Sequence, residues 1–331
     1  MEQVRVAIFG LGTVGKEVAR ALLTKKGVSI VCVVDKGDAV GQDLGSVLGM
    51  ERLGVQVSSD AGAIAAARAQ VVIQSTATKV KDVYNQMKEI LQSGCNVITA
   101  AEEMVSPFVY DKEYAGLIDE LAKQHKASVL GTGLWPTWMD IDLPLLLSTG
   151  TRSVSYLKYA RNSDFRPYMG SVVAKHFGVG FTRAEFEAGL ESGQIVGHVG
   201  FEGSYDRLGH YFGWNIDSID KLVEPVYGVD GRTSGVITSA IGREKGVLRI
   251  EMSLHANTTD DWVTSDIIEV HGTPNVHMTI KPSLAGTVPV ANVLVNQIPF
   301  ALQAKPGIVL KSSVGSFCYA DLALIDGPPT L

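Results

Sequence analysis

The first 134 residues repeat one hydrophobic pattern, in which a short apolar run is followed by apolar positions at helical spacing. The apolar runs read VRVAIF, VSIVCVV, QVVIQ, NVIT and ASVLG. The helical stretches between them include KEVARALL, VKDVYNQMKEILQ and DKEYAGLIDELAKQHK. Strands and helices in strict alternation predict an α/β fold with a doubly wound parallel sheet.

The pattern changes after the stretch GTGLWPTWMDIDLPLLLS. Later strands are predicted for runs that alternate at period two: VSYLKYAR, GVLRIEMSLHAN, SDIIEVHG and VHMTIKPS. Thr182, with Glu185 three residues later, marks a helix start by a capping box. These features predict a second, α+β domain with a mixed or antiparallel sheet that helices cover on one face.

The last apolar stretch, PVANVLVNQIPFALQ, predicts one helix that ends near Pro299 or shortly beyond. A late helix of this kind is expected to pack back on the first domain. The domains expected are therefore residues 1–134, residues 135–290 and a terminal segment 291–331.

Composition narrows the functional class. With 331 residues, 46% of them hydrophobic and 19% charged, the chain is long enough for two packed domains. The formal net charge of −6 gives no electrostatic footprint for nucleic acid, and no signal peptide or membrane-spanning run is evident. Three scattered cysteines predict free thiols, and no H-E-x-x-H or C-x-x-C pattern predicts a metal site. We expect a cytoplasmic protein without metal, nucleic-acid or membrane partners.

A glycine motif follows the first apolar run. Gly10, Gly12 and Gly15 have the spacing G-x-G-x-x-G between a predicted strand and a predicted helix. The first glycine allows the tight turn, the second lets the backbone approach a pyrophosphate, and the third lets helix and strand pack closely. The motif predicts a Rossmann dinucleotide site, and its residues are Gly10, Leu11, Gly12, Thr13, Val14 and Gly15.

The second predicted strand ends in Asp35, twenty residues after Gly15. An acid at this place hydrogen-bonds the ribose 2′-hydroxyl of NAD and repels a 2′-phosphate. Lys36 follows directly and softens that repulsion, so NAD is favoured and NADP stays open. Further cofactor contacts are expected at the carboxyl ends of the later strands, from Ser75, Thr76, Ala77 and Ala100.

Two adjacent carboxylates, Glu102 and Glu103, follow the strand NVIT at the same edge of the predicted sheet. Because neighbouring residues of an extended chain point to opposite sides, only one of them faces a substrate beside the nicotinamide. The other begins the next helix, where an acid favours the helix dipole. A carboxylate in a dry pocket suits a positively charged substrate, so an amine is favoured over an alcohol.

Aromatic residues after the last strand of the first domain predict an apolar pocket. Trp135, Thr137 and Trp138 are its expected walls, although two tryptophans at a domain junction also suit an ordinary core. His198 lies between glycines in an expected loop and is the best placed of seven histidines, with a packing role as the alternative. Tyr168 is a further candidate neighbour, and Asn296 is a candidate contact for the nicotinamide amide.

Six motifs occur in order along nearly the whole chain: AIFGLGTVGKEVA, VVDKGDAVGQDLG, NVITAAEEM, GTGLWPTWMD, GHVGFEGS and ANVLVNQIP. Together they resemble the 2,4-diaminopentanoate dehydrogenases and the related native NAD(P)-dependent amine dehydrogenases, a group with a dihydrodipicolinate reductase-like fold. The resemblance implies a Rossmann domain at 1–134 and a domain at 135–290 that binds substrate and forms a homodimer. It also implies reversible oxidative deamination with NAD or NADP.

The active-site glutamate of this family falls within AAEEM. We assign it to Glu102 because the comparable strand end in homoserine dehydrogenase-like proteins carries the polar catalytic group there, and Glu103 stays an alternative. The diaminopentanoate enzymes read Asn-Pro-Gly-Phe where this chain has Trp135 to Trp138. Two indoles make the pocket smaller and apolar, and a second ammonium would be costly there. The expected substrate is therefore a small, mostly apolar primary amine, and the alternative is 2,4-diaminopentanoate itself.

Two rival functions remain at this stage. One is a homoserine- or dihydrodipicolinate-type oxidoreductase that acts on a carbonyl without ammonia, although the His-His-x-x-Lys run of dihydrodipicolinate reductases is missing. The other is a non-catalytic NAD-binding regulator. An amine dehydrogenase should oxidise NADH with a ketone only when ammonia is present, whereas a carbonyl oxidoreductase should not need ammonia. Replacement of Glu102 by Gln should remove most turnover from an enzyme but leave the function of a regulator intact.

Overall fold

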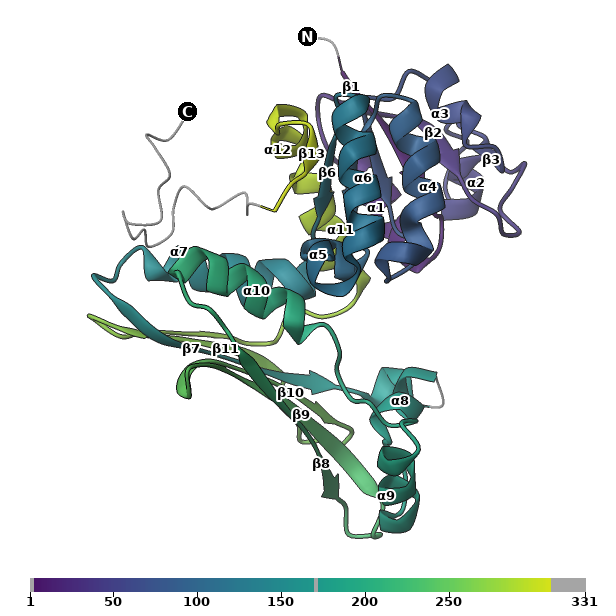
Figure 1. Cartoon of the computed structure of the whole chain (residues 1–331). Coiled ribbons are helices and arrows are strands. Elements are labelled where there is room, and N and C mark those ends of the chain that lie inside the picture. The colour runs from purple at the N-terminus through teal and green to yellow at the C-terminus, as the bar shows by residue number, and fades with distance from the viewer. Residues whose placement is uncertain (1–2, 170–171, 311–331) are drawn as a thin grey trace. The chain divides into compact units, whose positions relative to one another are not determined.

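The computed structural model describes residues 3–169 and 172–310, which form two compact units. The first unit comprises residues 3–138 and 286–310, so the chain leaves it and returns to it. The second unit comprises the described residues between 139 and 285. Figure 1 shows the elements of both units.

The first unit is built on a seven-stranded parallel sheet in the order β13-β6-β5-β4-β1-β2-β3. Its strands are β1 (Val4–Phe9), β2 (Val28–Val34), β3 (Val57–Ser58), β4 (Val71–Gln74), β5 (Asn96–Thr99), β6 (Ser128–Gly131) and β13 (Gly307–Ile308). This arrangement confirms the predicted doubly wound α/β fold.

Helices cover both faces of this sheet because successive residues of each buried strand point to opposite sides. Ala7 and Phe9 of β1 pack against α3, α4 and α6, whereas Val6 and Ile8 pack against α1, α2, α11 and α12. The helices of the unit are α1 (Thr13–Leu23), α2 (Leu44–Leu48), α3 (Gly62–Ala66), α4 (Val80–Gln92), the 3-10 helix η1 (Glu102–Val105), α5 (Pro107–Tyr110), α6 (Lys112–Gln124), α11 (Thr287–Asn296) and α12 (Ile298–Gln303).

The late apolar stretch forms two helices instead of the single predicted one. Helix α11 ends at Asn296, and α12 starts at Ile298 with Pro299 in its first turn. A proline has no N–H to continue the hydrogen bonds of a preceding helix, so the break falls just before it. Both helices pack against the first unit, α11 on α1 and α12 on β4 to β6. The predicted tail beyond residue 310 lies outside the described residues.

The second unit is built on a six-stranded mixed sheet in the order β12-β11-β7-β10-β9-β8, in which only β7 and β10 are parallel. Its strands are β7 (Val154–Asp164), β8 (Ser218–Tyr227), β9 (Thr233–Glu244), β10 (Val247–Asn257), β11 (Ser265–Gly272) and β12 (Val276–Ile280). The mixed sheet confirms the predicted α+β class. The sequence pattern missed β8, which is mostly exposed and contains Pro225, and β9, which is rich in small residues.

Helices line one face of the second sheet in Figure 1, where α7 and α10 run along it. Tyr205 of α10 is fully buried and donates its hydroxyl to Ala240 O of β9 at 2.6 Å. The predicted capping box of Thr182 and Glu185 is present at the start of α9. The helices are α7 (Leu143–Ser148), η3 (Arg166–Tyr168), α8 (Val172–Phe177), α9 (Arg183–Glu191) and α10 (Phe201–Phe212). The chain enters the unit through η2 (Leu134–Asp142, irregular at its start), whose first residues belong to the first unit.

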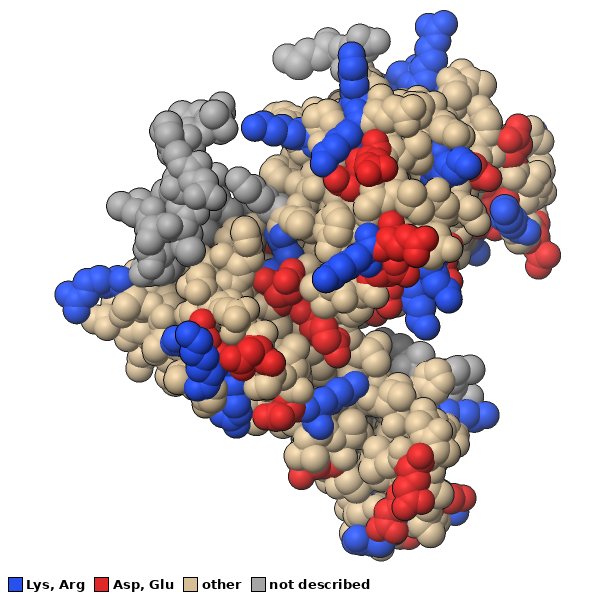
Figure 2. Space-filling view, viewed as in Figure 1, with Lys and Arg blue, Asp and Glu red and all other residues tan. Residues whose placement is uncertain are grey.

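Charged side chains of both signs are mixed on the visible face of each unit in Figure 2, without a patch of one sign. Within the described residues, no helix is both long and apolar enough to cross a membrane.

Candidate active site

Two close contacts shape the glycine-rich loop between β1 and α1. Gly10 has a φ of 97°, and a Cβ there would lie 2.9 Å from Ser75 O. A Cβ on Gly15 would lie 1.9 Å from Gly10 O, so only glycine lets α1 start this close to β1. A Cβ on Gly12, in contrast, would meet nothing within 4 Å. The space beside Gly12 is open at the place where a pyrophosphate would approach the backbone.

The first turn of α1 offers free backbone donors beside this space. Gly12 is the residue before the helix, and no side chain caps the turn that starts with Thr13 and Val14. Gly12 and Thr13 are both exposed. Uncapped N–H groups and the helix dipole favour an anion here, so the loop fits the diphosphate of a dinucleotide.

Asp35 follows β2 and is tied to the loop. One carboxylate oxygen accepts a hydrogen bond from Leu11 N at 2.5 Å, and the other accepts one from Gly37 N at 2.6 Å. Each oxygen keeps a second lone pair, so the carboxylate can also accept ribose hydroxyls. Lys36 is exposed directly beside it.

A buried polar network lies under the strand ends that carry Ser75, Thr76, Ala77 and Ala100. Gln74 and Thr99, the last residues of β4 and β5, are register partners and are fully buried. Thr99 Oγ1 donates to Gln74 Oε1 and accepts a hydrogen bond from Ala101 N at 3.0 Å. Gln74 Nε2 donates to Gln86 Oε1 at 2.8 Å and to Thr76 Oγ1. The hydrophobic pattern did not predict this network, although two polar residues that end apolar strands were a visible signal.

Glu102 begins η1, directly after β5. Its carboxylate is partly buried, and within the described residues it has no hydrogen bond or ion pair. Burial raises the pKa of Glu102, and the negative charge of Glu103 raises it further. A carboxyl group of this kind can exchange protons with a basic substrate closer to neutral pH than an ordinary glutamate.

The structure gives Glu103 a contact that the sequence did not predict. Its Oε2 accepts a hydrogen bond from Val80 N at 2.9 Å, at the start of α4. The carboxylate is therefore turned to the preceding helix. Glu103 also lies in the first turn of η1, so the prediction that one acid begins the next helix is confirmed. Glu103 as a substrate ligand stays a prediction.

The two tryptophans follow β6, the neighbour of β5, so they start from the same sheet edge as Glu102. Trp135 and Trp138 are partly exposed, and Trp138 N donates to Gly133 O at 3.1 Å. Thr137 between them is buried and has a φ of 134°, a conformation that costs a non-glycine residue energy. Their role as pocket walls stays a prediction.

The candidate residues of the second unit are Tyr168 and His198. Tyr168 ends η3, and its side chain lies outside the described part. The His198 ring packs edge-to-face against the Phe201 ring, with the two ring centroids 4.9 Å apart. The backbone N of His198 donates to Thr238 Oγ1. Burial, with lesser effects of Lys221 and Arg161, lowers the pKa of His198 to about 3. His198 is thus a neutral, packed ring, and a contact with substrate stays a prediction.

Asn296 does not lie where a nicotinamide contact requires. Its Oδ1 accepts a hydrogen bond from Lys25 Nζ at 2.8 Å, and Lys25 comes just after the C-terminal end of α1. Helix α1 begins at the carboxyl edge of the sheet, so its far end marks the opposite edge. The prediction of Asn296 as a cofactor ligand is therefore wrong.

The described residues contain no group of three or more His, Cys, Asp or Glu side chains that could hold a metal ion. Cys32 and Cys95 are buried free thiols, and burial raises the pKa of each to about 11. Cys318 lies outside the described residues.

Comparisons with known proteins agree with this geometry. Residues 139–315 match the family of the 2,4-diaminopentanoate dehydrogenase C-terminal domain, and residues 4–104 match the N-terminus of dihydrodipicolinate reductase. The 2,4-diaminopentanoate dehydrogenase of Acetoanaerobium sticklandii is 33% identical over 93% of this chain and 92% of its own length. The chain belongs to the 2,4-diaminopentanoate dehydrogenase family. It is an NAD(P)-dependent oxidoreductase.

Solved structures share the fold of this family member. The amine dehydrogenase of Mycobacterium smegmatis aligns over 93% of this chain and 94% of its own, with a TM-score of 0.77 and 24% identity. Dihydrodipicolinate reductase from Paenisporosarcina sp. TG-14 aligns over 93% and 97%, with a TM-score of 0.51 and 12% identity. GenD2 from gentamicin A biosynthesis, solved in complex with NAD, aligns over 92% and 87%, with a TM-score of 0.55 and 14% identity.

Proposed function

We propose that this family member catalyses the reversible oxidative deamination of a small, mostly apolar primary amine, with Glu102 as the group that handles the proton of the amine nitrogen. The observation that carries the proposal is an unpartnered, partly buried carboxyl of raised pKa at the carboxyl edge of the nucleotide-binding sheet. Ligands of such sheets bind outside the carboxyl ends of the strands.

In the proposed reaction, Glu102 accepts a proton from the substrate ammonium and so frees the nitrogen lone pair. A bound NAD(P), held by the glycine-rich loop and Asp35, would supply the hydride acceptor for the adjacent carbon. Loss of the hydride leaves a positively charged carbon–nitrogen double bond on the substrate. Glu102 passes its proton to solvent, and the carboxylate so restored stabilises that positive charge. Water adds to the carbon, the carbon–nitrogen bond breaks, and ammonia leaves with a carbonyl compound. Glu102 returns its proton in the reverse direction.

The substrate class is proposed from the residues after β6. Trp135 and Trp138 offer apolar surface. Among the described residues of the first unit no charged side chain is fully buried, so this surface has no buried acid that could pair with a second ammonium. Turnover of cyclohexylamine should exceed that of 2,4-diaminopentanoate. The alternative substrate, 2,4-diaminopentanoate itself, is supported by the curated relative, and a clear preference for the diamine would establish it.

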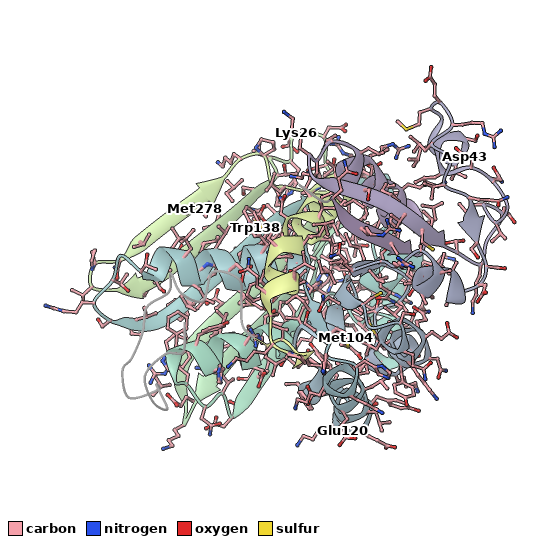
Figure 3. All side chains as sticks on the ribbon, turned by 90° about the horizontal axis from the view of Figure 1, so that it is seen from above. Lys26, Asp43, Met104, Glu120, Trp138 and Met278 are labelled. Carbon is pink, nitrogen blue, oxygen red and sulfur yellow. The ribbon has the colours of Figure 1, made fainter. Side chains whose placement is uncertain are left out.

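The central test is an NAD-reduction assay with wild-type protein and Glu102→Gln across a panel of amines, alcohols and amino acids. The variant should lose turnover roughly 100- to 10,000-fold and keep its affinity for the cofactor. Glu120→Gln is the matched control, because Glu120 is exposed on α6 and lies at the margin of the molecule in Figure 3. Reduction of ketones without ammonia would instead favour a carbonyl reductase, a reading supported by the N-terminal match.

We also propose NAD as the preferred cofactor and a homodimer as the assembly in the cytoplasm. The free lone pairs of Asp35 support NAD, because a 2′-phosphate would be repelled there. Titration with NAD and NADP tests this preference. The face of the second sheet opposite α7 and α10 carries partly buried polar pairs such as Tyr156 and Glu251, which suits an interface. Sedimentation analysis would distinguish one 35.4 kDa chain from two.

A further inference from the structure

The turn that carries Glu102 is fastened to α4 by its other glutamate. Glu103 N donates to Thr78 O at 3.1 Å, and Glu103 Oε2 accepts from Val80 N at 2.9 Å. Two hydrogen bonds of opposite direction thus join the same two segments. Because Glu103 supplies both a donor and an acceptor, η1 and the loop before α4 cannot shift independently.

Helix α4 has no local substitute for this carboxylate. Lys79 occupies the position before the helix, and its side chain makes no capping hydrogen bond. Glu103, 23 residues further along the chain, satisfies the N–H of Val80 instead. Its negative charge also suits the positive end of the helix dipole.

Two further residues of the turn, Ala101 and Met104, are held by neighbouring strands. Met104 is fully buried, and a Cβ on Gly131 of β6 would lie 2.1 Å from Met104 O. Ala101 N is held by Thr99 Oγ1. Ala101, Glu103 and Met104 are therefore all fixed, and Glu102 is the residue between them whose side chain stays without a partner.

The charge of Glu103 also acts on Glu102. Burial is the larger cause that raises the pKa of Glu102, and repulsion from the Glu103 carboxylate is the second. Strand β6 carries no titratable side chain. The other titratable groups on elements next to η1 are Tyr110 of α5 and, at the start of α4, Lys79, Lys81 and Asp82.

We propose that Glu103 is the positioning residue of this site: by capping α4 from η1, it fixes where the Glu102 carboxyl meets the substrate nitrogen. This inference rests on the proposed role of Glu102. Glu103 itself touches neither substrate nor cofactor and acts through Glu102 alone.

Two substitutions separate the geometric and the electrostatic part. Glu103→Gln keeps an oxygen that can accept from Val80 N but removes the charge. It should retain kcat within about threefold, while the limb of the kcat/KM pH profile that belongs to Glu102 moves to lower pH. Glu103→Ala removes the acceptor as well and should lower kcat by roughly 10- to 100-fold, because misplaced catalytic groups lose rate steeply. Hydrogen exchange at the first turn of α4 should accelerate in Glu103→Ala only.

Asp43→Asn provides the control for loss of a capping carboxylate elsewhere. Asp43 caps α2 by accepting from Gly45 N at 2.9 Å, and it lies well apart from Met104 in Figure 3. This variant should keep the wild-type kcat and pH profile. If Asp43→Asn moved the Glu102 limb as Glu103→Gln does, the assigned role of Glu103 would be refuted.

The outcomes distinguish this inference from the function on which it rests. If Glu102→Gln is inactive and both Glu103 variants keep the wild-type kcat and pH profile, the positioning role is refuted and the function stands. If Glu102→Gln keeps its turnover, the proposed function itself fails. If Glu103→Ala does not fold, the pH profile of Glu103→Gln alone decides: an unmoved limb refutes the inference.

Discussion

Among the described residues, the first unit buries no charged side chain, whereas the second buries Asp140, Asp142, Arg161, Arg207 and Asp266. In the first unit, the carboxylates of interest are Asp35, Glu102 and Glu103, which follow strands and stay partly exposed. In the second, Asp266 accepts the Tyr159 hydroxyl at 2.7 Å, and Asp140 accepts the Ser204 hydroxyl at 2.6 Å.

The difference follows from the partner that each charged side chain binds, a ligand in the first unit and another protein group in the second. A carboxylate that is to bind a ligand needs free lone pairs and access, and full burial would require a permanent partner. The first unit therefore keeps Asp35, Glu102 and Glu103 at the carboxyl edge of its sheet, where they stay accessible. The second unit places its charges inside, where Arg161 pairs with Asp266 and Asp140 accepts the Ser204 hydroxyl.

The largest loss of stability is expected when a buried charge of the second unit is removed. Arg161 Nε lies 3.7 Å from Asp266 Oδ1, and the guanidinium also donates to Leu284 O. Arg161→Leu removes the cation and leaves a buried carboxylate, which should cost about 3–5 kcal/mol. Peptide-resolved hydrogen exchange should show the loss in β7 and β11 and little change in the first unit.

The surface of the same sheet supplies the control for Arg161. Arg243 and Asp220 form an exposed pair with Nε and Oδ2 3.4 Å apart. Arg243→Leu should cost about 0–1 kcal/mol. Equal losses for the two arginine variants would contradict the idea that burial makes the second unit depend on its charges.

Two glycines test the edge of the first unit. Gly15→Ala places a Cβ 1.9 Å from Gly10 O and should cost about 1–3 kcal/mol of stability by overpacking. Gly12→Ala meets no atom within 4 Å, so the free energy of unfolding should stay nearly unchanged. Its affinity for NAD should nevertheless fall roughly tenfold or more, because the methyl group fills the pyrophosphate position. Denaturant titration and calorimetric NAD binding separate the two effects, and unimpaired NAD binding by Gly12→Ala would count against the assigned site.

The next largest loss of stability is expected for the buried network of Gln74 and Thr99 at the ends of β4 and β5. Thr99→Val keeps the shape of the side chain but leaves Ala101 N and Gln74 Oε1 without their partner. The loss of stability should be about 1–3 kcal/mol. Hydrogen exchange should rise at Ala100 to Met104 and stay unchanged in the second unit. An equally strong response in both units would contradict the idea that this network acts on the first unit alone.

The smallest effect concerns the pH dependence of stability. The pKa of Glu102 is raised in the folded protein, so the folded state holds its proton more tightly than the unfolded state. The contribution of protonated Glu102 to the free energy of unfolding is fully present below its ordinary pKa of 4.5. This contribution is lost as pH rises through the raised pKa of the folded protein. Glu102→Gln stays uncharged and should unfold at a higher temperature than wild type at pH 8, with little difference at pH 4. Thermal unfolding at both pH values checks the sign.

Features that depend on local spacing were predicted from sequence. The roles of Gly10 and Gly15 follow from the turn that three glycines make, and the parallel direction of the strands follows from strict alternation of strands and helices. Glu102 could be placed at the cofactor edge for the same reason. The pattern also predicted the capping box of Thr182, because both of its residues lie within one helical turn.

Features that depend on distant segments were not predicted. The hydrogen bond from Val80 to Glu103 links residues 23 positions apart, and Tyr159 and Asp266 lie 107 positions apart. Asn296 was misplaced because the sequence does not reveal at which sheet edge α11 ends. In each case the missing information was which groups meet in space, and periodicity does not contain it.

The return of the chain to the first unit has a consequence for synthesis in the cell. Helices α11 and α12 cover part of the first sheet, and β13 forms its edge, yet all three are made after the whole second unit. While a ribosome is still translating, the apolar surface of Val18, Leu22 and Ile98 has no cover from its own chain. The nucleotide-binding unit is therefore the first to emerge and the last to be completed. A nascent chain should gain tight cofactor affinity only after residue 303 has left the exit tunnel.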